Sequence, residues 1–434
     1  MTPIELGVAG CGLLLLLLVC SMPVAFVMAI AGVVGFAAVV STPAALSMMT
    51  VDLFDTFSSY SLTVIPLFIF MGQVAFHAGI SKRLFHTAYC WLGTLRGGLA
   101  MATVGACAAF GAICGSGPAT AATMASVALP EMKRYRYDME LASGTVAAGG
   151  SLGMLIPPSV VFIVYGILTE QSIGKLFISG VMPGILISIM FCITIHLLCR
   201  RRPELGPAAE GVTWAMRWRS LAGVVETLVL FVLIIGGMFT GLFTPTEAAA
   251  VGAAGTLVVA ALQRRLTWKA VVQSLKETVR TSCMVMIIVA GAVVFGRFLA
   301  VTRIPFELAS WLTGLPFPPW VIISLIILFY LVAGCFVDAL GLILLTVPIF
   351  YPVIEALHYD LIWFGVIIVV VTQMGVISPP VGVNVYVVSG IERDLPLQTV
   401  FKGALPFLVC LVAAAAILVA FPSISLWLPS LTYR

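Results

Sequence analysis

Long apolar runs, separated by short basic loops, cover the chain and predict membrane-spanning helices. Segments such as 227–236 and 408–420 are apolar on every face. A transmembrane barrel needs strands in which polar and apolar residues alternate, so this pattern excludes one. We expect ten helical crossings, at residues 4–20, 24–40, 61–79, 138–169, 172–199, 221–240, 245–263, 281–300, 361–389 and 396–422.

Two further apolar stretches, at residues 98–132 and 318–357, contain Gly, Ser, Pro or Asp in their middles and return to charged loops. We predict that each forms a re-entrant helical hairpin. Of the Lys and Arg residues, 18 then lie on one side of the membrane and four on the other, namely Lys175, Arg297, Arg303 and Arg434. By the positive-inside rule the first side is cytoplasmic, which makes both termini periplasmic.

Composition agrees with a membrane protein and excludes several functions. With 61% hydrophobic and 9% charged residues, the chain cannot cover a water-facing surface. The net charge of +4 comes from basic residues beside the spans, so nucleic acid is not an expected partner. The ten cysteines lie mostly in apolar runs without CxxC spacing, so we expect no metal centre and no cofactor. The first apolar run follows no charged segment, which favours a retained span over a signal peptide.

Two amphipathic segments, at residues 81–95 and 267–278, carry Lys and Arg on one face and apolar side chains on the other. We expect both to lie flat at the cytoplasmic membrane surface. Residues 203–213, rich in Pro, Glu and Gly, form a short polar linker near the middle of the chain.

The two halves of the chain share a motif at constant spacing. Tyr-Asp, Gly and Pro-Pro recur 222 residues apart, as Tyr137-Asp138, Gly153 and Pro157-Pro158, then as Tyr359-Asp360, Gly375 and Pro379-Pro380. The matched spans 61–79 and 281–300 are five crossings apart, so the repeats are inverted. Inverted repeats with broken helices are typical of secondary transporters, which bind substrate between the repeats near the membrane midplane.

This organisation predicts four parts. Residues 1–96 contain scaffold helices and an interfacial arm, and residues 97–200 contain the first transport-domain repeat, with hairpin 98–132 and broken helix 138–169. Residues 201–317 contain the linker, further scaffold helices and a second arm. Residues 318–434 contain the second repeat, with hairpin 318–357 and broken helix 361–389.

The prolines predict a cation site at each break. Proline has no N–H, so Pro157 and Pro158 leave the carbonyls of Gly153 and Met154 without helical partners. The second pair does the same to the carbonyls of Gly375 and Val376. Buried oxygens need a partner, and such neutral oxygens suit Na⁺. The alternative is a simple proline kink in which Ser or Thr side chains bond these carbonyls.

The hairpin tips add further candidate ligands. The first tip offers the Ser116 hydroxyl, and Pro118 suits the first turn of the returning helix, whose N-terminal dipole favours an anion. The second tip carries Asp338, and a carboxylate inside the membrane is a functional candidate by default. The alternatives are that Asp338 caps a helix and that the small residues of 100–126 serve close helix packing.

Six short motifs in a fixed order resemble a known family. They are Ile156-Pro-Pro-Ser159 with Tyr165-Gly166, Ser172-Ile173, Phe177 with Gly180–Gly184, Thr244-Pro-Thr-Glu247, the hairpin containing Pro348, and Ser378-Pro-Pro-Val-Gly-Val-Asn384. Over essentially its whole length the chain resembles the large membrane subunit of tripartite ATP-independent periplasmic (TRAP) transporters.

The resemblance implies an all-α, polytopic, inverted-repeat protein of the elevator type, with two re-entrant helical hairpins, in the bacterial inner membrane. It would import small organic anions, such as carboxylates or sugar acids, with Na⁺ as coupling ion. Its partners would be a small four-span membrane subunit, a periplasmic substrate-binding protein and the lipid bilayer.

The resemblance also implies site residues. The cation ligands would be Gly115, Ser116, Gly117, Gly153, Met154, Asp338, Thr372, Gly375 and Val376. The substrate-binding residues would be Pro158, Ser159, Pro380 and Asn384. The chain departs from the family, which often has Asn or Glu where Val371 and Gln373 stand here, and Thr where Ser378 stands.

Rival functions differ in the residues they need. An intramembrane protease needs a base beside Ser116, but all four histidines fall at span ends or in loops, so we expect no catalytic residue and no enzyme. An ATP-driven pump would need a GxxxxGK[ST] loop, which the chain lacks. A stand-alone ion-coupled dicarboxylate symporter of related fold, and a channel, remain open alternatives.

Overall fold

The computed structural model describes residues 2–208 and 213–432. Arg434 of the charge count and residues 209–212 of the expected linker lie outside the described residues. The helices of the first half are α1 (Pro3–Val19), α2 (Val24–Val39), α3 (Thr42–Ser58), α4 (Val64–His77), α5 (Ile80–Leu92), α6 (Gly98–Cys114), α7 (Gly117–Arg134), α8 (Met139–Ser151), α9 (Val160–Leu168) and α10 (Ile173–Arg201).

The second half is also helical. Its helices are α11 (Trp214–Ser220), α12 (Ala222–Phe231), α13 (Gly237–Phe239), α14 (Pro245–Leu262), α15 (Trp268–Thr302), α16 (Ile304–Thr313), α17 (Pro319–Gly334), α18 (Ala339–Ala356), α19 (Leu361–Gly375), α20 (Val383–Ile391), α21 (Leu397–Ala420) and α22 (Ser423–Thr432). A π-helical stretch at Val232–Gly236 joins α12 to α13. Among the described residues there is no strand, which confirms the predicted all-α class.

Each expected crossing corresponds to helical chain, and two of the crossings are broken. Seven helical segments of the described chain are long and apolar enough to span a bilayer: Tyr60–His77, Ile173–Arg201, Trp214–Phe239, Pro245–Leu262, Trp268–Thr302, Ala339–Ala356 and Leu397–Ala420. The two expected hairpins are the pairs α6–α7 and α17–α18, each joined by a short tip.

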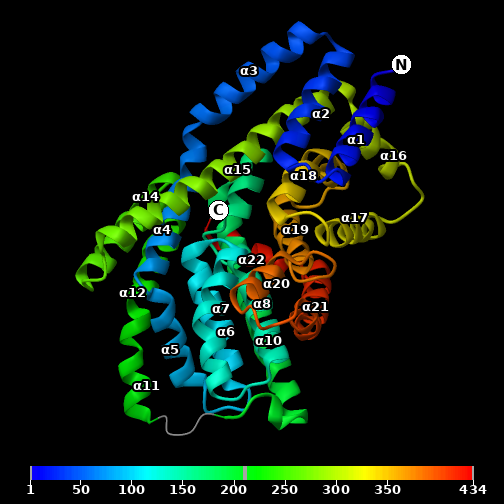
Figure 1. The fold of residues 1–434 in the computed structure, drawn as a ribbon. Helices are drawn as coiled ribbons and strands as arrows, with labels where there is room; N and C mark the ends of the chain where they lie inside the picture. Colours follow the sequence, from blue (N-terminus) through cyan, green and yellow to red (C-terminus); the bar gives the residue numbers. More distant parts are fainter. Residues whose placement is uncertain (1, 209–212, 433–434) are drawn as a thin grey trace.

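One of the two expected interfacial segments is continuous with a span. Residues 267–278 are no separate arm, because they form the first turns of α15, a single helix of 35 residues. Residues 81–95 fall largely in α5, which runs alongside α11 and α12 and packs against α6 (Figure 1). The surface position of α5 stays a prediction. The helices α3, α16 and α22 were not expected, since their sequences mix polar and apolar residues.

The helix order repeats at an almost constant spacing. Helices α6 and α17 begin 221 residues apart, α7 and α18 begin 222 apart, and α8 and α19 also begin 222 apart. Helices α9 and α20 begin 223 apart, and α10 and α21 begin 224 apart. Helix α5 matches α16 at a spacing of 224, which leaves α15 as the counterpart of α3 and α4. The predicted repeat therefore extends over entire helices.

Packing separates a hairpin unit from a surrounding frame. Helices α6, α7, α8 and α10 lie side by side in the middle of the molecule, and the second hairpin with α19 and α21 packs beside them (Figure 1). The frame is built mainly by α15 against α2, α3 and α4, and by α14 against α4. The hairpin unit meets its surroundings where α4 and α15 pass the hairpin tips, where α5 packs on α6, and where α16 packs on α18.

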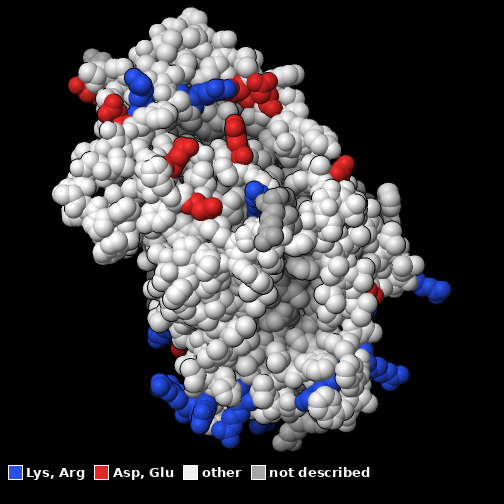
Figure 2. All heavy atoms as spheres, turned by 180° about the vertical axis from the view of Figure 1, so that it is seen from behind, with Lys and Arg blue, Asp and Glu red and all other residues white. Residues whose placement is uncertain are grey.

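Charged side chains are distributed unevenly between the two ends of the molecule. On the face shown in Figure 2, most visible Lys and Arg side chains gather at the lower end, and most visible Asp and Glu side chains lie nearer the upper end. The lower end contains α5, α11 and the last turns of α10 (Figure 1). Such an asymmetry is the pattern that orients a membrane protein.

Candidate functional site

Each repeat contains one helix that is interrupted at its Pro-Pro pair. In the first repeat, α8 passes into a short 3₁₀ turn at Leu152–Met154, and α9 begins at Val160. In the second repeat, α19 ends at Gly375 and α20 begins at Val383. Both Pro-Pro bonds are cis. The interruptions therefore occur at matched positions, as the sequence repeat predicts.

The matched Tyr-Asp pairs start these two helices. The Asp138 side chain accepts a hydrogen bond from the Leu141 backbone N–H at 3.0 Å and caps α8. The Asp360 side chain accepts a bond from the Trp363 N–H at 2.9 Å and caps α19 in the same way. Capping of this kind satisfies N–H groups that have no helical partner. The two aspartates are therefore structural.

Each hairpin packs on the neighbouring break through a pair of glycines. A β-carbon at Gly111 would lie 2.8 Å from the Cα atom of Gly153, so α6 meets the first break at backbone distance. In the second repeat, a β-carbon at Gly375 would overlap the carbonyl of Gly334. Only glycine permits such close approach. The hairpins are thereby seated on the breaks in both repeats.

Backbone hydrogen bonds complete this seating. The Val160 N–H donates to the Gly115 carbonyl at 3.2 Å, and the Val381 N–H donates to the Cys335 carbonyl at 3.2 Å. Both acceptors lie at hairpin tips, and both donors follow a Pro-Pro pair. Each tip is therefore fixed to the chain just beyond its own break.

Three of the four carbonyls next to the prolines have partners within the protein. The Met154 carbonyl accepts a hydrogen bond from the Ser159 hydroxyl. The Gly375 carbonyl accepts from the Ser378 N–H at 3.2 Å, and the Val376 carbonyl accepts from the Asn384 N–H at 3.0 Å. The prolines alone predicted carbonyls without partners, but these three carbonyls each accept a hydrogen bond within the protein. A carbonyl has two lone pairs, so one bond still leaves room for a cation.

The two tips begin their returning helices differently. Ser116 stands at the N-cap of α7, but its side chain makes no capping hydrogen bond. Asp338 stands at the N-cap of α18, where its carboxylate accepts a hydrogen bond from the Leu340 N–H at 3.1 Å. The capping role considered for Asp338 is therefore confirmed. The first turn of α7, in contrast, offers N–H groups that no side chain caps.

Both tips line one cavity of about 300 Å³. Gly115, Ser116 and Gly117 line it from the first tip, and Asp338 lines it from the second. The frame closes the other side with side chains from α4 and α15, namely Ile69, Gln73, Thr281, Met284 and Val285. Among the described residues that line this cavity, Asp338 is the one that carries a formal charge.

The predicted site residues fall into two groups. Five of them line the cavity together: Gly115, Ser116, Gly117, Met154 and Asp338. The others lie behind the tips or beside the breaks and do not line it: Gly153, Thr372, Gly375, Val376, Pro158, Ser159, Pro380 and Asn384. Thr372 donates its hydroxyl to the Val369 carbonyl at 2.9 Å, within its own helix.

Two buried amides next to the second break lack partners. Gln373 is fully buried, and neither its amide nitrogen nor its amide oxygen has a hydrogen-bond partner in the described chain. Asn384 donates to the Ala147 carbonyl at 2.9 Å and so links the two repeats, but its own oxygen is unpartnered. Buried polar groups without partners are costly, so these atoms mark a place that accepts water or an ion.

The sequence did not reveal the frame residues of the cavity. Gln73 interrupts the apolar run of α4 and lines the cavity. Thr281 lies in the middle of α15. A polar residue inside an apolar span was a usable signal for Gln73. Thr281 carried no such signal, because threonine is common in spans.

Comparison with known proteins identifies relatives of the whole chain. Residues 11–424 match the family described as "Tripartite ATP-independent periplasmic transporter, DctM component". The C4-dicarboxylate TRAP transporter large permease protein DctM of Pseudomonas aeruginosa is 37% identical, over 90% of this chain and 91% of its own. The sialic acid TRAP transporter large permease protein SiaM of Vibrio cholerae is 34% identical, over 86% of this chain and 87% of its own.

A solved structure shares the fold. The YdaH transporter of Alcanivorax borkumensis matches with a TM-score of 0.62 over 89% of both chains, at 15% sequence identity. This likeness concerns the fold alone. The family model and the sequence relatives establish that the chain belongs to the large permease subunits, the DctM components, of the TRAP transporters.

Proposed function

We propose that this subunit carries small organic anions across the bacterial inner membrane, driven by Na⁺, with both of its termini in the periplasm. The cavity between the hairpin tips is the observation on which the proposal rests. It joins the tips of both inverted repeats with two frame helices. A site at that position is accessible from either side when the hairpin unit moves against the frame.

The first tip supplies the anion site. Helix N-termini bind anions because their free N–H groups and the helix dipole both favour negative charge. The N-terminus of α7 lines the cavity, and its cap residue, Ser116, leaves the N–H groups without a side-chain bond. A carboxylate of the substrate satisfies these groups.

The second tip supplies a reason for cation coupling. An organic anion that enters the cavity comes close to the Asp338 carboxylate. Two like unit charges about 6 Å apart repel each other by about 3 kcal/mol at an effective dielectric constant of about 20. A bound Na⁺ removes that repulsion. Substrate and Na⁺ therefore bind together more readily than substrate binds alone.

The cation ligands are oxygens around each tip. At the first tip these are the Ser116 hydroxyl and the carbonyls near Gly153 and Met154, and at the second they are Asp338 and the carbonyls near Gly375 and Val376. Hard monovalent cations prefer such oxygen ligands. Among the described residues no cluster of three His, Cys, Asp or Glu side chains forms a transition-metal site.

The movement we propose is an elevator motion of the hairpin unit. The cavity has walls from two units, because the tips belong to the repeats while Gln73 and Thr281 belong to the frame. A rigid displacement of the hairpin unit separates these walls and carries the site toward the other side of the membrane. In this proposal residues 1–96 and 201–317 form the scaffold, and residues 97–200 and 318–434 form the moving transport repeats.

The partners we propose are a small four-span membrane subunit and a periplasmic binding protein. The isethionate TRAP transporter permease protein DctMQ of Oleidesulfovibrio alaskensis is 32% identical over 96% of this chain, which covers only 65% of DctMQ. The remaining length of that relative is enough for a small fused subunit. The substrate of this chain would then be an organic acid chosen by its binding protein.

Reconstitution in proteoliposomes tests the proposal. The chain is purified with and without the small subunit and binding protein of its own bacterium, and uptake of radiolabelled succinate and N-acetylneuraminate is followed under an inward Na⁺ gradient. The proposal predicts accumulation only with all three proteins and only with Na⁺. Sodium-driven uptake by the lone chain would instead favour a stand-alone symporter. Flux that never exceeds equilibration would favour a channel.

Labelling of single cysteines tests the orientation. Residue Glu204 follows the basic end of α10, and Asp55 is an exposed residue of α3. A membrane-impermeant thiol reagent should label Glu204→Cys only from the cytoplasmic side and Asp55→Cys only from the periplasmic side. Labelling of both from one side would contradict the orientation.

A further inference from the structure

A second cavity, of about 620 Å³, lies at the basic end of the hairpin unit, between α5 and α7. The residues that matter for its chemistry are Lys82, His86 and Tyr89 on α5, and Ser126, Glu131 and Arg134 on α7. This cavity is separate from the one between the hairpin tips, with which it shares no lining residue.

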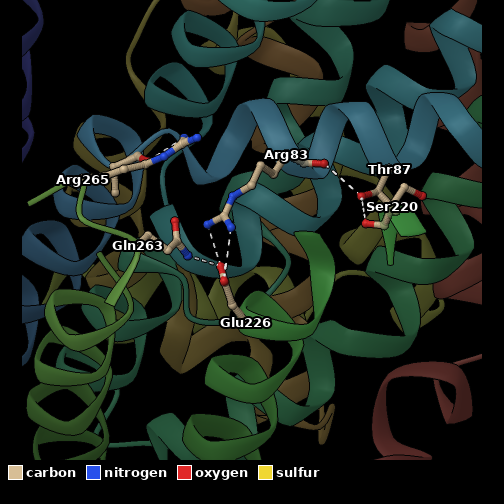
Figure 3. A network of polar contacts seen from close by, with 7 residues as sticks. Arg83, Thr87, Ser220, Glu226, Gln263 and Arg265 are labelled. Carbon is tan, nitrogen blue, oxygen red and sulfur yellow. Dashed lines mark hydrogen bonds and ion pairs between the residues drawn. The ribbon is translucent and has the colours of Figure 1, made fainter. Parts of the chain in front are cut away.

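Helix α5 forms one wall of this cavity, and hydrogen bonds to α11 and α12 hold it in place. Lys82, His86 and Tyr89 are four and three residues apart, so they share one face of the helix. Another face is held by Arg83, which donates two hydrogen bonds to the Glu226 carboxylate of α12 at 3.1 and 2.6 Å (Figure 3). Thr87 donates to the Ser220 carbonyl at 2.6 Å. The wall is therefore part of a rigid contact.

Other bonds strengthen the same contact. The Gln263 side chain donates to the Glu226 carboxylate, and Arg265 donates to the Ala78 carbonyl at 3.4 Å (Figure 3). Since Arg83 is committed to Glu226, the cations of α5 that remain for a ligand are Lys82 and, when protonated, His86.

Helix α7 connects the two cavities. Its first residues, Gly117 to Ala119, line the cavity between the tips, and Ser126 lines the second cavity seven residues further on. Seven residues of α-helix extend about 10 Å and return to nearly the same face. Ser126, Pro130 and Arg134 continue that face to the basic end. An anion that leaves the tips along α7 therefore meets the second cavity next.

The charge of the two linings is opposite. Asp338 gives the first cavity a negative lining. Lys82 and Arg134 outnumber Glu131 in the second, so the described residues lining it carry a net positive charge. Arg134 lies 3.9 Å from Glu131, but both side chains are exposed, and such a pair leaves most of the cation available.

We propose that the second cavity is a release site for the transported organic anion on its way to the cytoplasm. Lys82 and Arg134 hold its carboxylate, while Tyr89 and Leu99 contact the rest of the molecule. This inference rests on the proposed function, because it assumes that an organic anion is the cargo. The phosphate headgroup of an acidic lipid has the same chemistry, and the experiment below distinguishes the two sources.

Thiol labelling inside the cavity tests the charge without any transport. Ser126 is exposed, so Ser126→Cys presents a thiol there, and the parent chain without this cysteine supplies the background. In the complete complex in phosphatidylcholine liposomes, an anionic methanethiosulfonate should react faster than its trimethylammonium counterpart. Adding Lys82→Gln and Arg134→Gln should lower that ratio by about tenfold. Equal rates of the two reagents before these changes would overturn the inference.

Protection of the same thiol identifies the ligand. Millimolar succinate should slow the labelling of Ser126→Cys in phosphatidylcholine liposomes, and Lys82→Gln with Arg134→Gln should abolish the protection. Protection by phosphatidylglycerol in the liposomes, with none by succinate, would overturn the inference in favour of a lipid site.

Transport by the same variants separates this inference from the proposed function. Lys82→Gln with Arg134→Gln should lower kcat for uptake about tenfold with little change in KM, because release becomes slow after normal loading. The matched control is Lys269→Gln, which removes an exposed lysine that lines neither cavity. If the unchanged complex takes up no organic acid, the proposed function fails. If it does and the double variant matches Lys269→Gln, only the release site fails.

Discussion

The two hairpin tips have the same backbone arrangement but differ in their capping residues. In each repeat a pair of glycines lets the hairpin pack closely on its helix break. A carbonyl at each tip also accepts a hydrogen bond from beyond the Pro-Pro pair, from Val160 in the first repeat and from Val381 in the second. Ser116 leaves the N-terminus of α7 without a side-chain cap, whereas Asp338 caps α18 with a carboxylate. The difference lies in the capping residue.

A different capping residue at each tip lets two repeated hairpins form an asymmetric site. An uncapped helix N-terminus attracts an anion, and a capping carboxylate supplies that anion itself. Under the proposed function, the second tip therefore takes a cation and no organic acid. Both tips line one cavity, so the two proposed ligands would meet in it.

Removing the charge of the second tip should have the largest effect. In Asp338→Asn the side chain still caps α18, since asparagine is as good an N-cap as aspartate. The lost charged ligand should cost about 2–3 kcal/mol of cation binding, which raises the Na⁺ concentration for half-maximal uptake roughly 30- to 140-fold. Asp55→Asn, on the exposed face of α3, is the matched control. An unaltered Na⁺ dependence in Asp338→Asn would remove Asp338 from the cation site.

The glycine pairs should respond unequally to a methyl group. A β-carbon at Gly111 meets the backbone of Gly153 at 2.8 Å, whereas one at Gly334 has 3.4 Å to the Cα atom of Gly375. Gly111→Ala should therefore lower the free energy of unfolding by about 2 kcal/mol, while Gly334→Ala should be tolerated. Thermal unfolding of the purified complex measures this difference. Equal losses would contradict the difference in room at Gly111 and Gly334.

Giving the first tip the cap of the second should weaken the proposed anion site. In Ser116→Asp the new carboxylate caps α7 and occupies the place of the substrate carboxylate. The helix should gain about 1 kcal/mol in stability, while organic acid uptake falls roughly five- to thirtyfold, as expected for losing about 1–2 kcal/mol at a helix terminus. Ser116→Asn caps the helix without the charge and serves as control. Full uptake by Ser116→Asp would argue against an anion at this tip.

The smallest expected difference concerns the serines beside the breaks. Ser159 donates to the Met154 carbonyl and also caps α9 through the Phe162 N–H. Ser378 donates to the Met374 carbonyl at 2.6 Å, but α20 begins after Gly382, so Ser378 caps no helix. Ser159→Ala should cost about 1 kcal/mol more than Ser378→Ala. Denaturation midpoints of the two variants test this, and a larger loss in Ser378→Ala would contradict it.

The helix breaks and helix starts around the site could be predicted from the sequence, because their signals are local. Proline removes a backbone donor wherever it stands, so the breaks at Pro157 and Pro379 followed from the residue type. The two Tyr-Asp pairs stand at the starts of two matched helices, because Asp138 and Asp360 each cap the helix that follows. These features need no knowledge of distant contacts.

Other features depend on contacts that the sequence does not display. The Ser159 hydroxyl donates a hydrogen bond to the Met154 carbonyl. This bond depends on the geometry of the turn at the break, which the prolines alone do not specify. Gln73 and Thr281, which form part of the cavity wall, lie 208 residues apart in the sequence. The amphipathic pattern of 267–278 suggested a surface helix, but the helix continues unbroken into the span because no glycine or proline stops α15 there.

One measurement tests the asymmetry of the tips most directly. The complete complex and its Ser116→Asp and Asp338→Asn variants are reconstituted, and binding of radioactive Na⁺ and of radiolabelled succinate delivered by the binding protein is measured on the same samples. We predict that Ser116→Asp loses succinate binding and retains Na⁺ binding, because aspartate still offers an oxygen ligand, while Asp338→Asn retains succinate binding and loses the Na⁺ bound at the second tip. Retention of both ligands by both variants, or loss of the same ligand in both, would contradict the assignment of the anion site to the first tip and of Asp338 to a cation site.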